Sequence, residues 1–391
     1  MLGLYNNKKI KLLNSIKTQI RNNRKGYYSY KKKICIIAYE GFHANVVCNI
    51  VRICNYNTNY VEVYVHQSVK NELAELLCDD AEKVNWVIIP DIDDMHIYQS
   101  VSKIIGCSRR WDMIIIPSVE YDCMKYSPIF INHKKNTELV AGIHNLNRIF
   151  SSESSDPTFW NIINKTTSFA VISNLLFDEI KKQNLTSKKV YVFPSIFYED
   201  HKNSNYGENK KIVFVVPGIV DKARKNYDLV IETFANLEEY YNKISLIILG
   251  QATTPYGNEI INHCIRMNEK GLSVKYYKEY VPMVDFKTTM QKSDYILGPI
   301  NLSYTDHGLN EFYNKTKLSG IVGDMIEYAL PGIVPAELNM PSQLVSSTIF
   351  YESQEDLVEK IISLLDKDIA QKLASNALEN SRKYSLEDYL L

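Results

Sequence analysis

The chain has 391 residues, of which 45% are hydrophobic and 23% are charged, and its formal net charge is zero. This composition excludes a wholly disordered chain, and no apolar run reaches the roughly 18–20 residues that a membrane-spanning helix needs. The length predicts two domains. The N-terminal residues lack the apolar core of a secretory signal, so we expect a cytoplasmic protein. Seven cysteines without a C-x-x-C pair then predict reduced thiols rather than disulfides or a zinc site.

Residues 1–32 are predicted to form a basic N-terminal segment. The first 33 residues carry ten Lys or Arg and no Asp or Glu, so the rest of this neutral chain carries ten net negative charges. Such a segment favours an anionic partner, either the inner face of a membrane or nucleic acid. Apolar residues recur among these cations at helical spacing, at Ile10, Leu13, Ile16 and Ile20. This pattern suits a peripheral membrane helix, and the alternative is a solvated tail or a helix packed on the body. The acidic remainder holds no recognised nucleic-acid module, so we expect no nucleic-acid partner.

Residues 33–200 alternate short apolar runs with amphipathic stretches. We predict strands at 33–39, 60–66, 85–90, 112–117, 138–144, 168–173 and 189–193, and helices at 43–55, 69–78, 98–106, 158–164 and 174–183. Strands that alternate with helices predict a parallel sheet covered on both faces, which makes this segment a first Rossmann-like domain. The acids Asp91, Asp93 and Asp94 follow the third strand, and we interpret them as a solvated turn and helix cap rather than a metal site.

Residues 201–210 are polar and aperiodic, which predicts a linker, and the alternation then restarts. We expect strands at 211–216, 244–249, 272–277, 295–297 and 332–335, helices at 225–239, 256–270, 283–292, 319–328, 353–365 and 368–384, and a long irregular loop at 298–316. Residues 211–391 thus form a second Rossmann-like domain, whose last helix we expect to pack back on the first. The prediction is an α/β fold of two doubly wound domains that face each other across a cleft, with ligands at the carboxyl ends of the strands.

The first strand of the second domain is followed by a candidate phosphate site. Neither half carries the G-x-G-x-x-G or P-loop pattern, which argues against a nicotinamide dehydrogenase or a P-loop kinase. Instead, Gly218 and then the cations Arg224 and Lys225 follow the strand. Glycine permits a tight turn where a ligand comes close, and clustered cations suit a diphosphate. A solvated loop is the alternative interpretation.

A second candidate anion site lies at the start of the helix predicted at 319–328. Ser319 and Gly320 begin that helix, where backbone N–H groups and the positive end of the helix dipole are available to an anion. Asp324 follows one turn later, where its carboxylate can accept hydrogen bonds from ribose hydroxyls. Two candidate anion sites at corresponding strand ends of one domain are stronger evidence for an anionic ligand than either site alone.

Several short motifs between residues 211 and 385 occur in the order that is found in glycosyltransferases of the GT-B fold, and most resemble the family 4 type. They are the strand and glycine loop at 214–218 with the basic residues at 224–226, the strand ending in glycine at 246–250, the "V-x-Y … V-P" segments at 274–276 and 280–282, the pattern at 286–299 that contains Ser293 and Asp294, and the helix at 324–333. In the first half, residues 138–146 resemble the family's strand that ends in "H-N". The resemblance implies donor binding in the second domain and acceptor binding in the first.

Two positions depart from the family pattern. The first Glu of the family's E-x7-E pair is Thr316 here, and the second position is Asp324. The basic residue after the loop glycine is replaced by Ile219. Glu311, in the long loop, is a candidate substitute for the missing Glu, and Arg224 is the candidate substitute for the missing cation.

The resemblance implies a metal-independent, retaining hexosyltransferase without a cofactor. It would move a sugar from a nucleotide-diphosphate sugar to a glycan or lipid-linked acceptor in surface polysaccharide or glycoconjugate synthesis. The catalytic candidates are His144, Arg224 and Lys225. The donor-binding candidates are Gly218, Tyr280, Val281, Pro282, Thr316, Lys317, Ser319, Gly320 and Asp324, and the acceptor candidates are Gly41 and His43. A sugar-nucleotide 2-epimerase and a non-catalytic partner protein of the same architecture are the alternatives.

Overall fold

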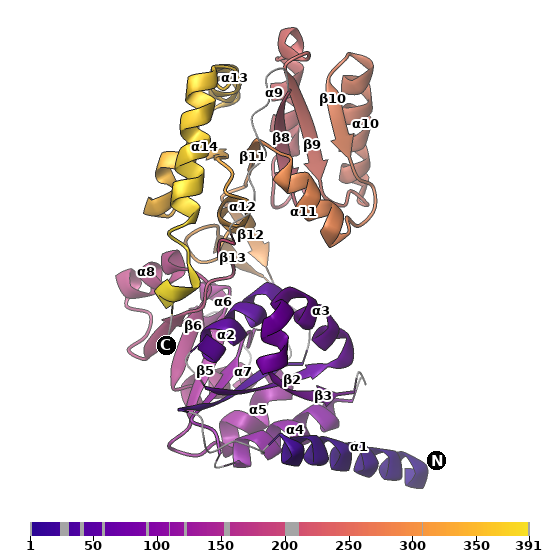
Figure 1. Cartoon of the computed structure of the whole chain (residues 1–391), viewed down its shortest axis with the longest axis vertical. Coiled ribbons are helices and arrows are strands. Elements are labelled where there is room, and N and C mark those ends of the chain that lie inside the picture. The colour runs from indigo at the N-terminus through magenta and orange to yellow at the C-terminus, as the bar shows by residue number, and fades with distance from the viewer. Residues whose placement is uncertain are drawn as a thin grey trace. The chain divides into compact units, whose positions relative to one another are not determined.

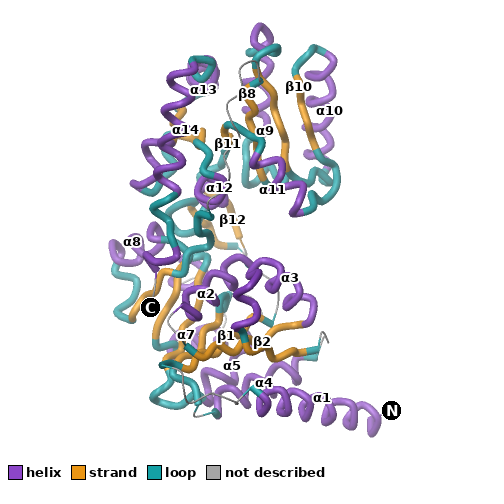
Figure 2. Tube along the Cα trace, viewed as in Figure 1, coloured by secondary structure: helices purple, strands orange, loops and turns teal. Residues whose placement is uncertain are grey.

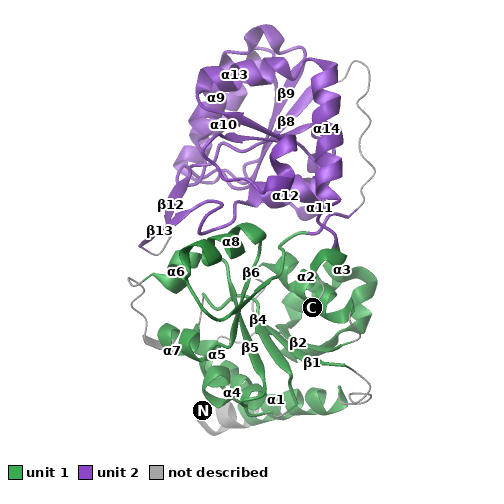
Figure 3. Ribbon diagram, turned by 90° about the vertical axis from the view of Figure 1, so that its left-hand side faces the viewer, with its two compact units in different colours: residues 1–196, 386–391 green, residues 197–385 purple. Residues whose placement is uncertain are grey.

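A computed structural model describes residues 2–23, 31–39, 43–56, 59–90, 94–108, 110–120, 123–151, 157–199, 211–306 and 308–389. The chain divides into two compact units, the first formed by residues 1–196 with 386–391 and the second by residues 197–385 (Figure 3). The linker predicted at 201–210 lies outside the described residues. In both units parallel strands alternate with helices along the chain (Figure 1, Figure 2), so the prediction of two doubly wound α/β domains is confirmed.

Over the described ranges, unit 1 holds a seven-stranded parallel sheet in the order β3-β2-β1-β4-β5-β6-β7. The strands are β1 (Lys33–Ala38), β2 (Tyr60–His66), β3 (Asn85–Ile89), β4 (Met113–Ile116), β5 (Glu138–Ile143), β6 (Ser168–Val171) and β7 (Lys189–Val192). Every residue of β2 and β4 is buried. Burial on both faces of a parallel sheet is why most of these strands read as uninterrupted apolar runs.

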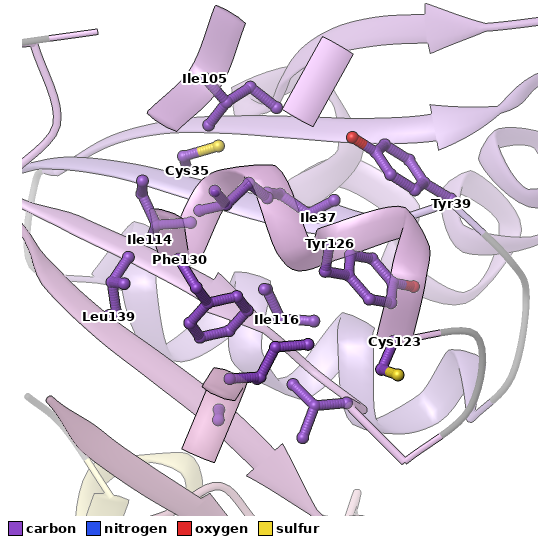
Figure 4. Close-up of a cluster of buried hydrophobic side chains, with 14 of the residues drawn as sticks. Cys35, Ile37, Tyr39, Ile105, Ile114, Ile116, Cys123, Tyr126, Phe130 and Leu139 are labelled. Carbon is purple, nitrogen blue, oxygen red and sulfur yellow. The ribbon is translucent and has the colours of Figure 1, made fainter. Parts of the chain in front are cut away.

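Helices cover both faces of the first sheet. They are α1 (Leu2–Asn22), α2 (Ala44–Tyr56), α3 (Gln67–Leu77), α4 (Met95–Cys107), α5 (Cys123–Asn132), α6 (Leu146–Phe150), α7 (Pro157–Lys165) and α8 (Asn174–Gln183), with the 3-10 turns η2 (Cys78–Lys83) and η5 (Leu386–Tyr389). Helix α4 packs between α1 and α5, and α2 packs beside α3. Side chains from α4 and α5 fill the core above β1, β4 and β5, among them Ile105, Tyr126 and Phe130 (Figure 4).

Within the basic N-terminal segment, the described helix α1 packs into the core of unit 1. On α1, Ile16 and Ile20 are buried in the core. The Gln19 side chain accepts a hydrogen bond from the N–H of Ile88 on β3 at 2.8 Å. Of the interpretations given above, these contacts favour the helix packed on the body, and attachment to a membrane stays a prediction. No helix in the described part of the chain is long and apolar enough to cross a bilayer.

Unit 2 holds, within its described residues, a six-stranded parallel sheet in the order β10-β9-β8-β11-β14-β15. Its strands are β8 (Ile212–Pro217), β9 (Ile244–Leu249), β10 (Ser273–Tyr276), β11 (Tyr295–Leu297), β14 (Gly332–Pro335) and β15 (Thr348–Tyr351). Phe214 of β8 is in register with Leu246 of β9 and Tyr295 of β11. The carboxyl ends of β8 and β11 therefore lie side by side, and the loops that follow them can share a site.

The segment between β11 and the next helix differs from its prediction as an irregular loop. It contains an antiparallel hairpin of β12 (Ser303–Asp306) and β13 (Leu309–Phe312). The helices α5 and α6 and the strand β15 were likewise not indicated by the sequence.

The helices of unit 2 are α9 (Tyr227–Ala235), α10 (Pro255–Glu269), α11 (Met283–Gln291), α12 (Gly320–Tyr328), α13 (Gln354–Ser363) and α14 (Lys367–Ser381), with the turns η3 (Glu238–Tyr240) and η4 (Ser342–Ser347). The last helix, α14, packs on α12 and η4 of its own unit, and the expectation that it also packs back on the first domain stays a prediction. The turn that follows α14, η5, belongs to unit 1. There η5 contacts α2, and Asn174 of α8 donates to the Tyr389 hydroxyl at 3.5 Å.

Candidate functional site

A pocket of about 320 Å³ lies in unit 2 at the carboxyl ends of β8 and β11. Its walls come from the loops after these two strands, from residues 224 and 225 before α9, and from the first turns of α12. Phe286 of α11 and Tyr313, which follows the hairpin, complete the lining. Six of the predicted site residues thus meet at one pocket: Gly218, Arg224, Lys225, Ser319, Gly320 and Asp324.

Two glycines let the loop after β8 form the floor of this pocket. Gly218 has a φ of 89°, a left-handed conformation that favours glycine, and its N–H donates to the Leu249 carbonyl at 2.9 Å. Gly250 follows β9, and a Cβ atom there would lie 1.9 Å from the Gly218 carbonyl oxygen. The loop can therefore lie close to β9 only because both positions are glycine.

The loop between β8 and α9 is tied to the loop after β11. The N–H of Asn226 donates to the Pro299 carbonyl at 2.7 Å, and the N–H of Asn301 donates to the Arg224 carbonyl at 3.0 Å. The Asn301 side chain also donates to the Lys222 carbonyl at 2.8 Å. Since Asn226 caps α9 through the N–H of Leu229, the predicted helix at 225–239 begins only at Tyr227. The two cations therefore lie in a braced loop at the pocket wall.

The two cations have different environments. Lys225 is partly buried, and its ammonium donates to the Pro217 carbonyl. Burial lowers the pKa of Lys225 to about 8, against the opposing charge of Asp324. Arg224 is half exposed, with its Nε 3.4 Å from an Asp221 oxygen and its guanidinium 5.2 Å from the centre of the Tyr304 ring.

The start of α12 provides hydrogen-bond donors to the same pocket. The first amides of a helix have no partner within the helix and carry its positive end. Ser319, the N-cap residue, is fully buried, and its N–H donates to the Asn314 side chain at 2.8 Å. The Ser319 hydroxyl has no hydrogen-bond partner among the described residues. This hydroxyl is therefore available to a polar ligand or to a water molecule in the pocket.

Asp324 lies one turn into α12 and faces the pocket. Burial, together with the nearby charge of Glu327, raises the pKa of Asp324 to about 7, and the charge of Lys225 opposes this shift. The carboxyl group can therefore change charge close to neutral pH, in the same pocket as a lysine whose pKa is lowered.

Five predicted donor-binding residues do not line this pocket. The Thr316 hydroxyl donates to the buried carboxylate of Glu311 at 2.6 Å, and the Lys317 ammonium donates to the Tyr304 hydroxyl. The other three, Tyr280, Val281 and Pro282, immediately precede α11. Val281 is buried, whereas Tyr280 and Pro282 are exposed. Sequence reasoning did not assign Phe286, Tyr313 or Asn314 to the site, because nothing in their local pattern marks them as pocket residues.

The remaining candidates belong to unit 1, at the carboxyl ends of β1 and β5. His144 is buried, its Nε2 lies 3.0 Å from the Pro117 carbonyl, and its ring stacks on His43 at 4.0 Å between centroids. Glu120 was not predicted. Its buried carboxylate accepts from the N–H groups of His144 and Asn145. Gly41 lies outside the described residues.

Within the described ranges, no group of three or more His, Cys, Asp or Glu is arranged to hold a metal ion. Asp94 accepts from the N–H of His96 at 2.9 Å and caps α4, as its interpretation as a helix cap predicts. Asp91 and Asp93 lie outside the described residues.

No protein-family model matches the sequence, and no curated protein matches it. Solved structures do match. A glycosyltransferase from Rickettsia africae ESF-5 is 12% identical, with a TM-score of 0.62 over 92% of this chain and 96% of that chain. The pneumococcal O-GlcNAc transferase GtfA, solved with UDP and GlcNAc, is 8% identical, with a TM-score of 0.62 over 92% and 97%. A UDP-N-acetylglucosamine 2-epimerase is 11% identical, with a TM-score of 0.55 over 91% and 94%.

At identities this low, the similarity of the structures shows the fold but does not distinguish one GT-B family from another. The resemblance to family 4 therefore stays a prediction. The GT-B fold itself is confirmed. Two parallel α/β sheets of seven and six strands in the described residues match glycosyltransferase structures over nearly the whole of both chains. This chain therefore has the GT-B fold.

Proposed function

We propose that this chain is a glycosyltransferase that uses a nucleotide-diphosphate sugar as its donor. The observation that supports it best is the pocket of unit 2. Arg224, Lys225 and the start of α12 surround it, and the buried Ser319 hydroxyl has no partner among the described residues. These groups are suited to a diphosphate, and Asp324 lies in the same pocket, within one helical turn of the α12 start. The related GtfA structure holds UDP.

In the proposed reaction, the bond between the anomeric carbon and the diphosphate oxygen breaks, and its electron pair stays on the diphosphate. The acceptor hydroxyl oxygen bonds to that carbon. In the retaining, metal-independent reaction that we expect, the leaving diphosphate takes up the hydroxyl proton. Arg224, Lys225 and the α12 amides would stabilise the charge that develops on the diphosphate, since fixed donors stabilise developing charge without reorganisation. Asp324 would accept hydrogen bonds from the ribose.

The acceptor side of the proposal rests on unit 1. There the stacked His43 and His144 rings lie at the carboxyl ends of β1 and β5, the two strands that flank β4, beside the buried Glu120. We assign a glycan or lipid-linked hydroxyl to these imidazoles, in surface polysaccharide or glycoconjugate synthesis.

Attachment to an anionic membrane surface is part of the same proposal. The outward face of α1 exposes Lys11, Lys17 and Arg21, while the inward face packs on unit 1. Binding would therefore depend on charge alone, at about 1 kcal/mol for each cation near the surface. The variant K11E/K17E/R21E should lose sedimentation with anionic vesicles, whereas three exposed lysines of unit 2 changed likewise, K270E/K367E/K372E, should not. Equal binding of the two variants to anionic vesicles would contradict membrane attachment through α1.

The donor site is tested by calorimetry with UDP, GDP, CDP and ADP, with and without chelator. We expect micromolar binding of one diphosphate, unaffected by chelator, and a loss of about tenfold or more in Arg224→Ala, because a hydrogen bond to a charged group is removed. Lys222→Ala is the matched control, since Lys222 lies in the same loop but does not line the pocket. Binding of none of the four nucleotides would overturn the proposal.

The 2-epimerase alternative is favoured by the likeness to an epimerase structure. Epimerisation exchanges the proton at C2 of the sugar, whereas transfer releases the nucleotide. Incubation with the nucleotide sugar in D2O separates the two, because deuterium at C2 indicates the epimerase. Release of nucleoside diphosphate without deuterium incorporation indicates the transferase.

A further inference from the structure

The β12–β13 hairpin carries one side chain that reaches back to the pocket wall. Tyr304 of β12 is only 8% exposed, although its neighbours Ser303 and Thr305 are exposed. Its ring stacks on Tyr313, with centroids 5.4 Å apart and planes 21° from parallel. Tyr313 in turn lines the pocket. The hairpin is thus joined to the pocket through a pair of stacked tyrosines.

Two cations lie against the Tyr304 ring. The Arg224 guanidinium is 5.2 Å from the ring centre, and the Lys317 ammonium is 4.9 Å from it and also donates to the ring hydroxyl. Both distances fall within the range of attraction between a cation and an aromatic ring. Of the two cations, Arg224 lines the pocket and Lys317 does not.

These contacts fix the direction of the Arg224 side chain. Asp221 pairs with its Nε at 3.4 Å, and the Tyr304 ring lies against its guanidinium. Half of the Arg224 side chain is exposed, and a long exposed side chain otherwise loses rotational freedom when it binds a ligand. A guanidinium that is already held in place binds an anion with less of that loss.

We propose that Tyr304 is a positioning residue of the donor site, which holds the Arg224 guanidinium at the pocket for the diphosphate. This inference rests on the proposed function. The hairpin would then contribute to the affinity for the donor, although it is remote in sequence from the loop after β8.

The test is a double-mutant cycle that measures affinity for the nucleoside diphosphate that the wild type binds. Tyr304→Leu removes the ring and should weaken binding about two- to fivefold, the range of an exposed cation–ring contact. In the Arg224→Ala background the same change should have no further effect, because Tyr304 acts through Arg224. Tyr304→Phe keeps the ring and should restore affinity to within about twofold of wild type.

Thr305→Ala is the matched control on the hairpin. Its hydroxyl donates to Asn310 at 2.9 Å on the exposed side, and its loss should leave diphosphate affinity unchanged. If Tyr304→Leu does not fold, pentafluorophenylalanine at position 304 removes the attraction for cations while it keeps the ring's shape, and the same loss is expected.

The outcomes separate the two proposals. A wild type that binds no nucleoside diphosphate overturns the proposed function, and the role of Tyr304 with it. Binding that Arg224→Ala weakens but Tyr304→Leu leaves unchanged overturns only the role of Tyr304. So do losses that add fully in the double variant, because they would make the two residues independent.

Discussion

The N–H of Ser319 donates to the side chain of Asn314, whereas the Ser319 hydroxyl, in the same buried residue, has no partner in the described part of the chain. Asn314 is itself fully buried, with a φ of 56° that asparagine tolerates better than most residues. Asn314 therefore satisfies the N–H of the N-cap residue and leaves the Ser319 hydroxyl to the pocket.

Ser319→Ala should consequently separate binding from stability. Removal of a hydroxyl without a partner should leave the melting temperature unchanged or raised, while diphosphate affinity falls by about two- to tenfold. Ser347→Ala is the opposite case, since that buried hydroxyl donates to the Leu344 carbonyl at 3.0 Å in another part of unit 2. It should lower the melting temperature and leave affinity unchanged. Calorimetry and thermal unfolding of both variants check the pair.

Diphosphate affinity should fall as the pH rises from 7.5 to 9, a range in which the terminal phosphate of the ligand is already ionised. Asp324 gains its charge as the pH passes its pKa of about 7, and Lys225 loses its charge as the pH passes its pKa of about 8. Both changes make the pocket less positive. A bound anion favours the charged lysine, so affinity should fall by up to about tenfold per pH unit above pH 8. Lys225→Met should flatten that part of the profile, and an affinity that rises with pH would contradict the assignment.

Gly250→Ala should destabilise unit 2 and displace the pocket floor. The new Cβ would lie 1.9 Å from the Gly218 carbonyl oxygen, and backbone atoms cannot move aside cheaply. We expect a loss of about 2–3 kcal/mol in the free energy of unfolding. Gly271→Ala is the control, because its φ is 101° but its Cβ would meet nothing within 4 Å. It should lose only about 1 kcal/mol, from backbone strain. Urea unfolding measures both.

Substitutions at Thr316 and Glu311 should have coupled effects on the stability of unit 2. Thr316→Val removes a hydroxyl that donates to a buried carboxylate, and it should cost about 1–3 kcal/mol of stability. Thr316→Glu, which restores the family's residue, should cost more, because a second carboxylate would then lie against Glu311. Glu311→Gln in the same chain should recover part of that loss. Thermal unfolding that shows no recovery would mean that the two positions act independently.

Helix α1 should contribute to the stability of unit 1. Ile16→Ala leaves a cavity in the core and should lower the free energy of unfolding by about 2–5 kcal/mol. Ile10→Ala, on the exposed face of the same helix, should change it by less than about 0.5 kcal/mol. Equal effects in denaturant unfolding would show that the helix is not docked in solution.

The strands could be predicted from sequence because strands buried on both faces must be apolar. The strand observed at Ile244–Leu249 has the predicted bounds, and four of its six residues are buried. Helix α5 escaped prediction because Pro128 lies inside it, and proline ordinarily marks a helix end. The hairpin was missed because its strands have four residues each and mix polar with aromatic side chains. Short strands of that kind carry no clear alternation.

The residues of the candidate site also fall into two groups, those that the sequence could place at the pocket and those that it could not. Residues that immediately follow a strand or begin a helix, such as Gly218 and Ser319, could be placed at the pocket from sequence, because the fold puts strand ends together. Tyr313 and Phe286 could not, since they reach the pocket only through packing between distant segments. Lys317 was assigned to the donor for its charge, but its ammonium contacts Tyr304, which depends on a hairpin that the sequence did not reveal.

The return of η5 to unit 1 bears on how the protein is made. Unit 1 contains residues 1–196, but its last turn is added only after the 189 residues of unit 2 have been translated. At about 5–20 residues per second, that interval is roughly 10–40 s. During that time the part of α2 that η5 contacts in the finished protein is uncovered in the nascent first unit. A premature stop anywhere in unit 2 would leave that surface uncovered permanently, so a nonsense mutation late in the reading frame should weaken the domain that was synthesised first.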